Sequence, residues 1–412
     1  MFDTRKTMMA VSVAMAVAAP LAAQAQTSVQ VYGKLYPQIN RYKLSGATAA
    51  GAAGSTLSTR TGGADVTGVV MESPNARLGF RGTEDLGGGL KALFQLESSF
   101  GVDTGQLGNT NVLFGRDSFV GLAGGFGTVR LGNMDTVYKN LGDTLSFLGV
   151  ASGNFMSSSN ILSKPAIAGG ASSFHLRRNN SLIYETPEIA GFQALADYSF
   201  GETAGDFQRG SVISAGVKYE NGPIYAAVAH ERHNDLFGAS STIPTAIRNG
   251  AVVGGTFTPG AGSASSTDTA TRLTVQYKIT GDTRVEANIA RLDYDETGTG
   301  TTPGAATFRN YNTRTWALGA EHKMGPVTLA ASYGQASAGS CSLSVGACST
   351  AGMDGKMFNI GAGYSLSKRT LLYTVYSRLN NGASARYDNL DPGNPAAGQD
   401  ITQFAVGISH SF

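Results

Sequence analysis

The connections between the segments of this chain alternate between short and long, and this order constrains the fold more than any single motif. From residue 28 onward, segments of about ten residues alternate apolar with polar side chains, which is typical of two-faced β-strands. The pattern predicts sixteen such strands, at 28–41, 75–82, 90–100, 112–123, 127–134, 178–187, 190–202, 210–221, 223–234, 269–280, 283–295, 312–324, 326–336, 355–367, 369–380 and 399–412.

The short connections include Asn221-Gly222 and Met324-Gly325, and the long ones lie near 44–71, 101–111, 135–177, 203–209, 235–268, 296–311, 337–354 and 381–398. In an up-and-down sheet, all short turns then fall at one end and all long loops at the other. A soluble sandwich has no reason to keep this order, whereas transmembrane barrels have short periplasmic turns, long external loops and an even strand number. We therefore predict an all-β, transmembrane antiparallel β-barrel of sixteen strands, in which every backbone group can pair.

The last predicted strand supports a barrel in a membrane. Its apolar face carries Phe404, Val406, Ile408 and Phe412, with His410 among them. In a soluble protein this face would expose apolar surface to water. In a membrane barrel the strand would close the sheet against segment 28–41 and place the Phe412 ring at the membrane interface.

The amino-terminal residues have the pattern of an export signal. Arg5 and Lys6 precede an apolar run over 8–19, and Ala23-Gln24-Ala25 supplies small residues at a cleavage-site spacing. We predict a signal peptide over 1–25, cleaved between Ala25 and Gln26, and a barrel over 26–412.

Export also bears on the two cysteines, because disulfides persist outside the cytoplasm. Cys341 and Cys348 lie in Gly/Ser-rich sequence, and we predict a local disulfide across one loop. Free thiols or a zinc site are less favoured, since no histidine lies nearby.

Composition and motifs exclude several classes of function. Lys and Arg total 31 against 29 Asp and Glu, so no basic signature of nucleic-acid binding is present. No G-x-S-x-G elbow, P-loop or H-E-x-x-H motif occurs. His230 and His233 fall on opposite faces of one strand, which is poor geometry for a metal. We expect no catalytic residue, no metal site and no cofactor.

Three stretches resemble the general, non-specific porins of the β-proteobacterial type. They are residues 74–97, which read PNARLGFRGTEDLGGGLKALFQLE, residues 114–132, which read FGRDSFVGLAGGFGTVRLG, and the opening VQVYG at 29–33. The resemblance covers essentially the whole chain after residue 25. It implies a homotrimeric barrel in the outer membrane of a Gram-negative bacterium, surrounded by lipid and lipopolysaccharide and passing ions and small polar solutes. It also implies that the third long loop folds into the lumen, and Phe412 resembles the terminal aromatic residue that the outer-membrane barrel assembly machinery reads.

The alternation of faces assigns lumen candidates without the resemblance. Lys34, Arg77, Arg81 and Arg130 lie opposite apolar outward residues on neighbouring strands, and clustered bases in a narrow passage favour anions. Arg116 is a weaker candidate, because Val120 and Leu122 share its face. The alternative is that some of these bases are paired with lumen carboxylates such as Glu97.

The segment 135–177 is the expected constriction loop, because it is long yet contains apolar residues such as Leu141, Phe155 and Ile161. Asp143 is its most plausible lumen acid, opposite the basic wall, and Asp135 is less certain. We predict a water-filled channel that prefers small anions. A substrate-specific channel is the main alternative, and a barrel enzyme or a surface adhesin is less favoured.

Overall fold

The computed structural model describes residues 28–59, 61–108, 112–142, 155–167, 173–253, 256–259, 264–299, 304–389 and 394–412. The predicted signal peptide 1–25, its cleavage site at Ala25 and Gln26, and Asp143 lie outside these residues. No helix in the described ranges is long and apolar enough to span a membrane.

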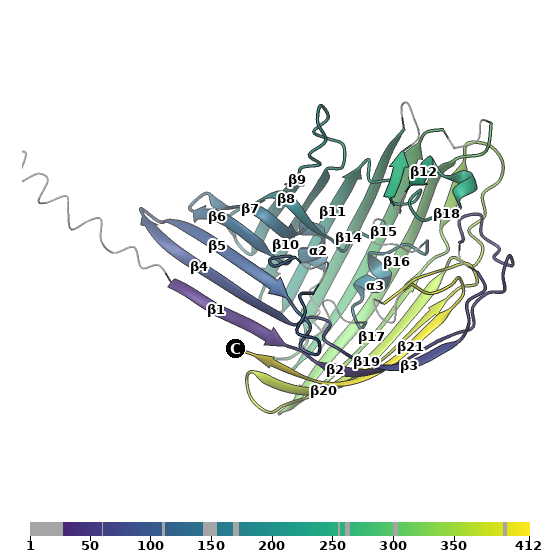
Figure 1. Ribbon diagram of the computed structural model, residues 1–412. Coiled ribbons are helices and arrows are strands. Elements are labelled where there is room, and N and C mark those ends of the chain that lie inside the picture. The colour runs from purple at the N-terminus through teal and green to yellow at the C-terminus, as the bar shows by residue number, and fades with distance from the viewer. Residues whose placement is uncertain are drawn as a thin grey trace, which may run out of the picture.

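Antiparallel strands dominate the described residues (Figure 1). One continuous sheet contains β1 (Ser28–Leu35), β2 (Gln38–Ser45), β3 (Val66–Glu72), β4 (Arg77–Gly87), β5 (Leu90–Ser99), β6 (Ser118–Gly124), β7 (Gly127–Asp135), β8 (Arg177–Glu185), β9 (Phe192–Ser199), β10 (Val212–Asn221), β11 (Ile224–Asn234), β14 (Ser265–Lys278), β15 (Thr283–Thr297), β16 (Phe308–Met324), β17 (Val327–Ala336), β18 (Ser340–Leu343), β19 (Gly355–Ser365), β20 (Thr370–Asn381) and β21 (Asp400–Ser411). The remaining elements are α2 (Val137–Gly142), α3 (Ser159–Leu162), η4 (Thr245–Ile247), and a separate hairpin of β12 (Gly250–Val253) and β13 (Thr256–Pro259).

Three wall strands are each interrupted once. β1 and β2 continue one another across Tyr36-Pro37, and β3 and β4 continue across a break that contains Pro74. Proline lacks the N–H that a sheet ladder needs, so a break at these positions is expected. β17 and β18 continue across a break at Gly339, and both pair with β16. Counted in this way, the described part of the wall has sixteen strands, which confirms the predicted closed barrel.

The first and last strands close the barrel. β21 pairs with β2 from Gln38↔Gly407 to Ser45↔Asp400, and with β1 at Lys34↔Ser411. At the end of this seam, Gly33 and Phe412 exchange two backbone hydrogen bonds of 3.1 Å each. The predicted pairing of the terminal strand with segment 28–41 is confirmed.

Three predicted strand boundaries were wrong. The strand expected at 326–336 continues after a break as β18, inside the loop expected at 337–354. The expected loop 44–71 is shorter, because β2 continues to Ser45 and β3 begins at Val66. The residues 66–70 are mostly β-branched, but their sequence follows a long Gly/Ala/Ser/Thr stretch that hides the alternation. The strand expected at 112–123 begins only at Ser118, because Arg116 and Asp117 turn their side chains into polar contacts with neighbouring strands.

The strand faces alternate as the membrane requires. Outward residues such as Val228, Ile289 and Leu318 are large and 49–60% exposed. Inward residues such as Thr274 and Asn288 are polar and buried by their lumen neighbours. The outward apolar band is the expected lipid-facing surface of a barrel.

The first cysteine lies in β18 and the second follows that strand. Cys341 and Cys348 form a disulfide with their Cα atoms 5.6 Å apart, which confirms the predicted local bridge. The bridge closes a short loop at the long-loop end of the barrel.

A substitution at the seam tests how the barrel closes. A Cβ at Gly33 would lie 2.8 Å from the Arg77 carbonyl oxygen and would also press on the Phe412 ring. Gly33→Val should therefore destabilise the folded barrel, by about 1–3 kcal/mol, as overpacking generally does. The measurement is the temperature at which the purified barrel loses its compact mobility on SDS gels. Gly281→Val is the matched control, because a Cβ there has nothing within 4 Å; equal unfolding temperatures in the two variants would contradict the prediction.

Candidate functional site

The described parts of the segment between β7 and β8 lie inside the barrel, and α2 packs on the lumen wall (Figure 1). The Val137 backbone N–H donates to Asp197 Oδ2 at 2.7 Å, and the Tyr138 N–H donates to Ser214 Oγ at 2.8 Å. The Tyr225 hydroxyl donates to the Leu141 carbonyl at 2.8 Å. These contacts place α2 against the inward faces of β9, β10 and β11.

The later part of the same segment reaches a different arc of the wall. The side-chain amide of Asn359 on β19 donates to the Met156 carbonyl at 3.0 Å. The Arg386 N–H donates to the Ala166 carbonyl at 2.8 Å. Gly334 on β17 makes room for the loop, since a Cβ there would lie 3.0 Å from Ile161 Cγ2. The predicted lumen loop is therefore confirmed.

Burial explains why this loop stays inside. Nine of its large apolar side chains are at most 4% exposed, namely Val137, Tyr138, Leu141, Phe155, Met156, Ile161, Leu162, Ile167 and Phe174. An external loop in water would gain little from them, whereas burial of each is worth about 1.5–3 kcal/mol. Burial also raises the pKa of Tyr138 to about 12, so this phenol remains neutral.

The first group of predicted bases surrounds one carboxylate. Arg77 Nε lies 3.6 Å from Glu97 Oε2, Arg116 Nε donates to Glu97 Oε1, and the Tyr32 hydroxyl donates to Glu97 Oε2 at 3.0 Å. Lys34 is the direct cross-strand neighbour of Arg77. The structure thus brings Lys34, Arg77 and Arg116 together, and pairing with Glu97 accounts for two of them.

Arg81 and Arg130 have different surroundings. Arg81 Nε donates to Gln30 Oε1 at 3.0 Å, and the guanidinium lies 4.8 Å from the centre of the Tyr32 ring. Within the described ranges, no carboxylate lies within 4 Å of the Arg81 guanidinium. Arg130 is paired with Glu185 and lies 5.1 Å from the centre of the Phe119 ring. Both arginines are on the inward face, as predicted.

A second charged network at the base of the loop was missed by the sequence reasoning. Arg177 Nε lies 2.8 Å from Asp117 Oδ1, and Arg177 Nη2 lies 2.7 Å from Asp135 Oδ1. Lys139 Nζ lies 2.8 Å from the same Asp135 oxygen. Asp135 and Arg177 are also cross-strand partners. The two ends of a loop between paired strands must lie side by side. The opposite charges of Asp135 and Arg177, at the two ends of this loop, could therefore have predicted their ion pair from the sequence.

Together, these lumen side chains carry an excess of positive charge. Seven bases face four carboxylates: Lys34, Arg77, Arg81, Arg116, Arg130, Lys139 and Arg177 against Glu97, Asp117, Asp135 and Glu185. Asp143 lies outside the described residues, so its place opposite this wall stays a prediction. The arrangement suits electrostatic selection of ions rather than proton transfer or nucleophilic attack.

The carboxylates of the opposite wall are covered. Asp197, Glu231, Asp268, Glu286 and Glu296 are at most 5% exposed. Several of them hold loops in place: Asp268 Oδ2 accepts from the Gly238 N–H at 3.0 Å, and Glu296 Oε1 accepts from the Ser240 N–H at 2.9 Å. These acids contribute little negative charge to the accessible lumen.

Comparison with known proteins agrees with this geometry. Residues 10–384 match the family model described as Gram-negative porin. The chain belongs to the Gram-negative porin family. It is 31% identical over 349 residues to outer membrane porin protein 32 of Delftia acidovorans, which covers 82% of this chain and 84% of that protein. Membership of this family makes the protein an outer-membrane channel and not an enzyme.

Solved structures share the fold of this porin. The anion-selective porin from Comamonas acidovorans superposes with a TM-score of 0.67 at 24% identity, covering 94% of this chain and 100% of that one. OmpT of Vibrio cholerae, solved in a trimer form, has a TM-score of 0.59 at 14% identity, covering 94% and 99%. At these identities the likeness is one of fold.

Neutralising the shared carboxylate should strengthen the positive field. In Glu97→Gln, Arg77 and Arg116 lose their common counter-charge. A unit charge about 7 Å from a permeating ion in water is worth about 0.6 kcal/mol, which is about threefold in permeability. Its loss favours anions and disfavours cations by that factor, so the anion-to-cation permeability ratio should rise about sevenfold. The measurement is the reversal potential across a planar bilayer in a KCl gradient. Glu97→Asp, which keeps the charge, should stay near the parent; a ratio that falls or stays unchanged in Glu97→Gln would contradict the assignment.

Proposed function

We propose that this porin passes small anions in preference to cations by passive diffusion. The observation that carries the proposal is the net positive charge of the lumen side chains described above, with seven bases against four carboxylates on the wall and at the base of the loop. The Comamonas acidovorans protein that shares the fold is itself named an anion-selective porin, which supports the same direction of selectivity. The solutes would be inorganic anions and small, hydrophilic, negatively charged molecules.

The proposed mechanism needs no chemical step. A sixteen-stranded barrel is wide enough to hold water, and the loop inside it narrows the passage. Fixed guanidinium groups against low-dielectric walls raise the local concentration of anions and lower that of cations. Lys34, Arg77, Arg81, Arg116 and Arg130 would form the basic side of the constriction, and the loop 135–177, with Asp143, would form the other.

Arg81 and Arg130 should each contribute to anion selectivity. Arg81 has no acidic partner among the described residues, and removal of Arg130 would release the charge of Glu185. In the double variant Arg81→Gln/Arg130→Gln, the anion-to-cation permeability ratio should therefore fall by about fiftyfold, taking about sevenfold for each charge. Reversal potentials in a KCl gradient measure this ratio.

Arg209→Gln is the control, because Arg209 lies exposed in the connection between β9 and β10, away from the lumen wall. It should leave the permeability ratio unchanged. Clear cation preference in the parent protein would refute anion selectivity, and an unchanged ratio in the double variant would remove Arg81 and Arg130 from the constriction.

We also propose that the chain matures by cleavage between Ala25 and Gln26 and assembles as a homotrimer. The wall strands β6 and β9 have seven and eight residues, against seventeen in β16. A short wall exposes less apolar band to lipid, which suits contact with a neighbouring subunit. Phe412 at the seam would be read by the barrel assembly machinery. An intact mass that includes residues 1–25, or single rather than threefold closing steps in channel recordings, would contradict these points.

Lipopolysaccharide is the partner that the outer rim suits best. Six bases lie on the outward face near the long-loop end: Arg41, Lys43, Arg291, Arg314, Lys356 and Arg378. Charge-assisted bonds from such bases suit phosphate groups. The triple variant Arg41→Gln/Arg314→Gln/Lys356→Gln should retain less lipopolysaccharide on purification, measured by phosphate analysis per protein. Equal retention in variant and parent would contradict this role.

A further inference from the structure

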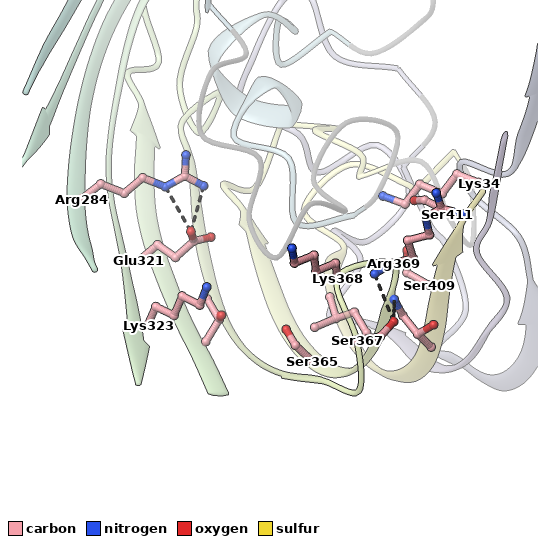
Figure 2. Close-up of a pocket in the computed structure, with 13 residues that line it drawn as sticks. Lys34, Arg284, Glu321, Lys323, Ser365, Ser367, Lys368, Arg369, Ser409 and Ser411 are labelled. Carbon is pink, nitrogen blue, oxygen red and sulfur yellow. Dashed lines mark hydrogen bonds and ion pairs between the residues drawn. The ribbon is translucent and has the colours of Figure 1, made fainter. Parts of the chain in front are cut away.

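A second basic region lies at the short-turn end of the lumen. It is a recess of about 480 Å³ (Figure 2), bounded by the ends of β15, β16 and β17, by the turn between β19 and β20, and by β21 and β1. Short turns face the periplasm in outer-membrane barrels, so this basic recess lies at the periplasmic mouth of the channel. Its lining is Lys34, Arg284, Glu321, Lys323, Thr328, Ser365, Ser367, Lys368, Arg369, Thr370, Leu371, Ser409 and Ser411.

The charges of the basic recess are unbalanced. Its lining carries five basic side chains and one carboxylate. Arg284 forms an ion pair with that carboxylate, since its Nε and Nη2 lie 3.1 and 2.9 Å from Glu321 Oε1. Across the ranges that the structure describes, no carboxylate lies within 4 Å of the charged nitrogens of Lys323, Lys368 or Arg369. Within that part of the chain, three positive side chains around one recess therefore have no counter-charge.

The turn between β19 and β20 presents two of these bases on a defined backbone. The Leu366 N–H donates to the Thr370 carbonyl at 2.9 Å, and Ser367 Oγ accepts from the Arg369 and Thr370 N–H groups at 3.1 Å each. Because that hydroxyl accepts both bonds, its own hydrogen remains able to donate to a ligand. Figure 2 shows Arg284, Glu321 and Lys323 on one side of the recess, Lys34 with Ser411 on the other, and Lys368 between them.

We propose that the basic recess binds multivalent oxyanions, meaning small molecules with two or more phosphate or carboxylate groups. A monovalent anion can compensate one base and leaves the others repelling one another. A ligand with two anionic groups can engage Lys323 on the wall and Lys368 or Arg369 on the turn together, through charge-assisted hydrogen bonds. The proposal deepens the proposed anion channel by adding a binding site built from residues other than Arg81 and Arg130. Ligand held there would impede flow through the periplasmic mouth.

Two measurements on the full-length purified protein test this site. Isothermal titration calorimetry with pyrophosphate, and separately with citrate, reads binding without any need for conductance and distinguishes phosphate from carboxylate ligands. Single-channel recording in KCl, with the same ligand added to one side at a time, reads interruption of the current. We expect saturable binding and a stronger interruption from the short-turn side. In Lys323→Gln/Lys368→Gln, affinity should fall by at least about tenfold, because two charge-assisted contacts are lost.

The matched control is Lys91→Gln/Lys218→Gln. It removes two lysines from the inward face of β5 and β10, neither of which lines the recess, and should bind pyrophosphate like the parent. Compact mobility on SDS gels verifies folding of each variant, and the single variant Lys323→Gln, at a strand end, provides a milder test. Equal affinity in the parent and in the folded recess variants, or loss of binding only in Arg81→Gln/Arg130→Gln, would overturn the proposal. A cation-preferring channel that still binds pyrophosphate would instead refute only the proposed selectivity.

Discussion

Closure of the backbone hydrogen-bond ladder is the constraint on which the rest of this structure depends. In hydrocarbon an unpaired N–H or C=O costs several kcal/mol, so a sheet that spans a membrane must have no free edge. The seam between β21 and the β1–β2 strand removes that edge. Once the sheet is closed, the side chains must divide between lipid and lumen with a period of two residues. The position of every lumen base follows from that division.

The fold could be predicted from the sequence because it depends on interactions between residues that are close in the chain. Alternation and turn chemistry act between near neighbours, and they located all sixteen strands and the inward face of Arg77, Arg81 and Arg130. They failed at Val66–Glu72, where small residues hide the period, and at 112–117, where side-chain contacts displace strand geometry. The ion pairs could not be deduced in this way. Arg116 reaches Glu97 from 19 positions away and Arg177 reaches Asp117 from 60, so these pairs depend on three-dimensional register.

The two sides of the lumen use charge differently. Bases on β1, β4 and β7 project into the passage, where carboxylates offset them only in part. Acids on β9 to β15 lie under loops and accept hydrogen bonds from loop backbone, as Asp197 does from α2 and Glu296 does from Ser240. These donors offset only part of the cost of burying each carboxyl group. The sequence contains nearly equal numbers of acids and bases, but the bases face the water of the lumen and many of the acids are buried. The accessible lumen is therefore more positive than the net charge of the chain suggests.

Anchoring loops on lumen carboxylates couples surface variation to permeability. A loop that changes length or sequence at the cell surface also changes which acids beneath it are covered. Surface remodelling that leaves the barrel wall untouched would thus alter the electrical character of the passage. In such a molecule, variation at the cell surface and control over what enters the cell are not independent traits, because Asp268 and Glu296 accept hydrogen bonds from loop backbone and would face the lumen if that loop no longer covered them.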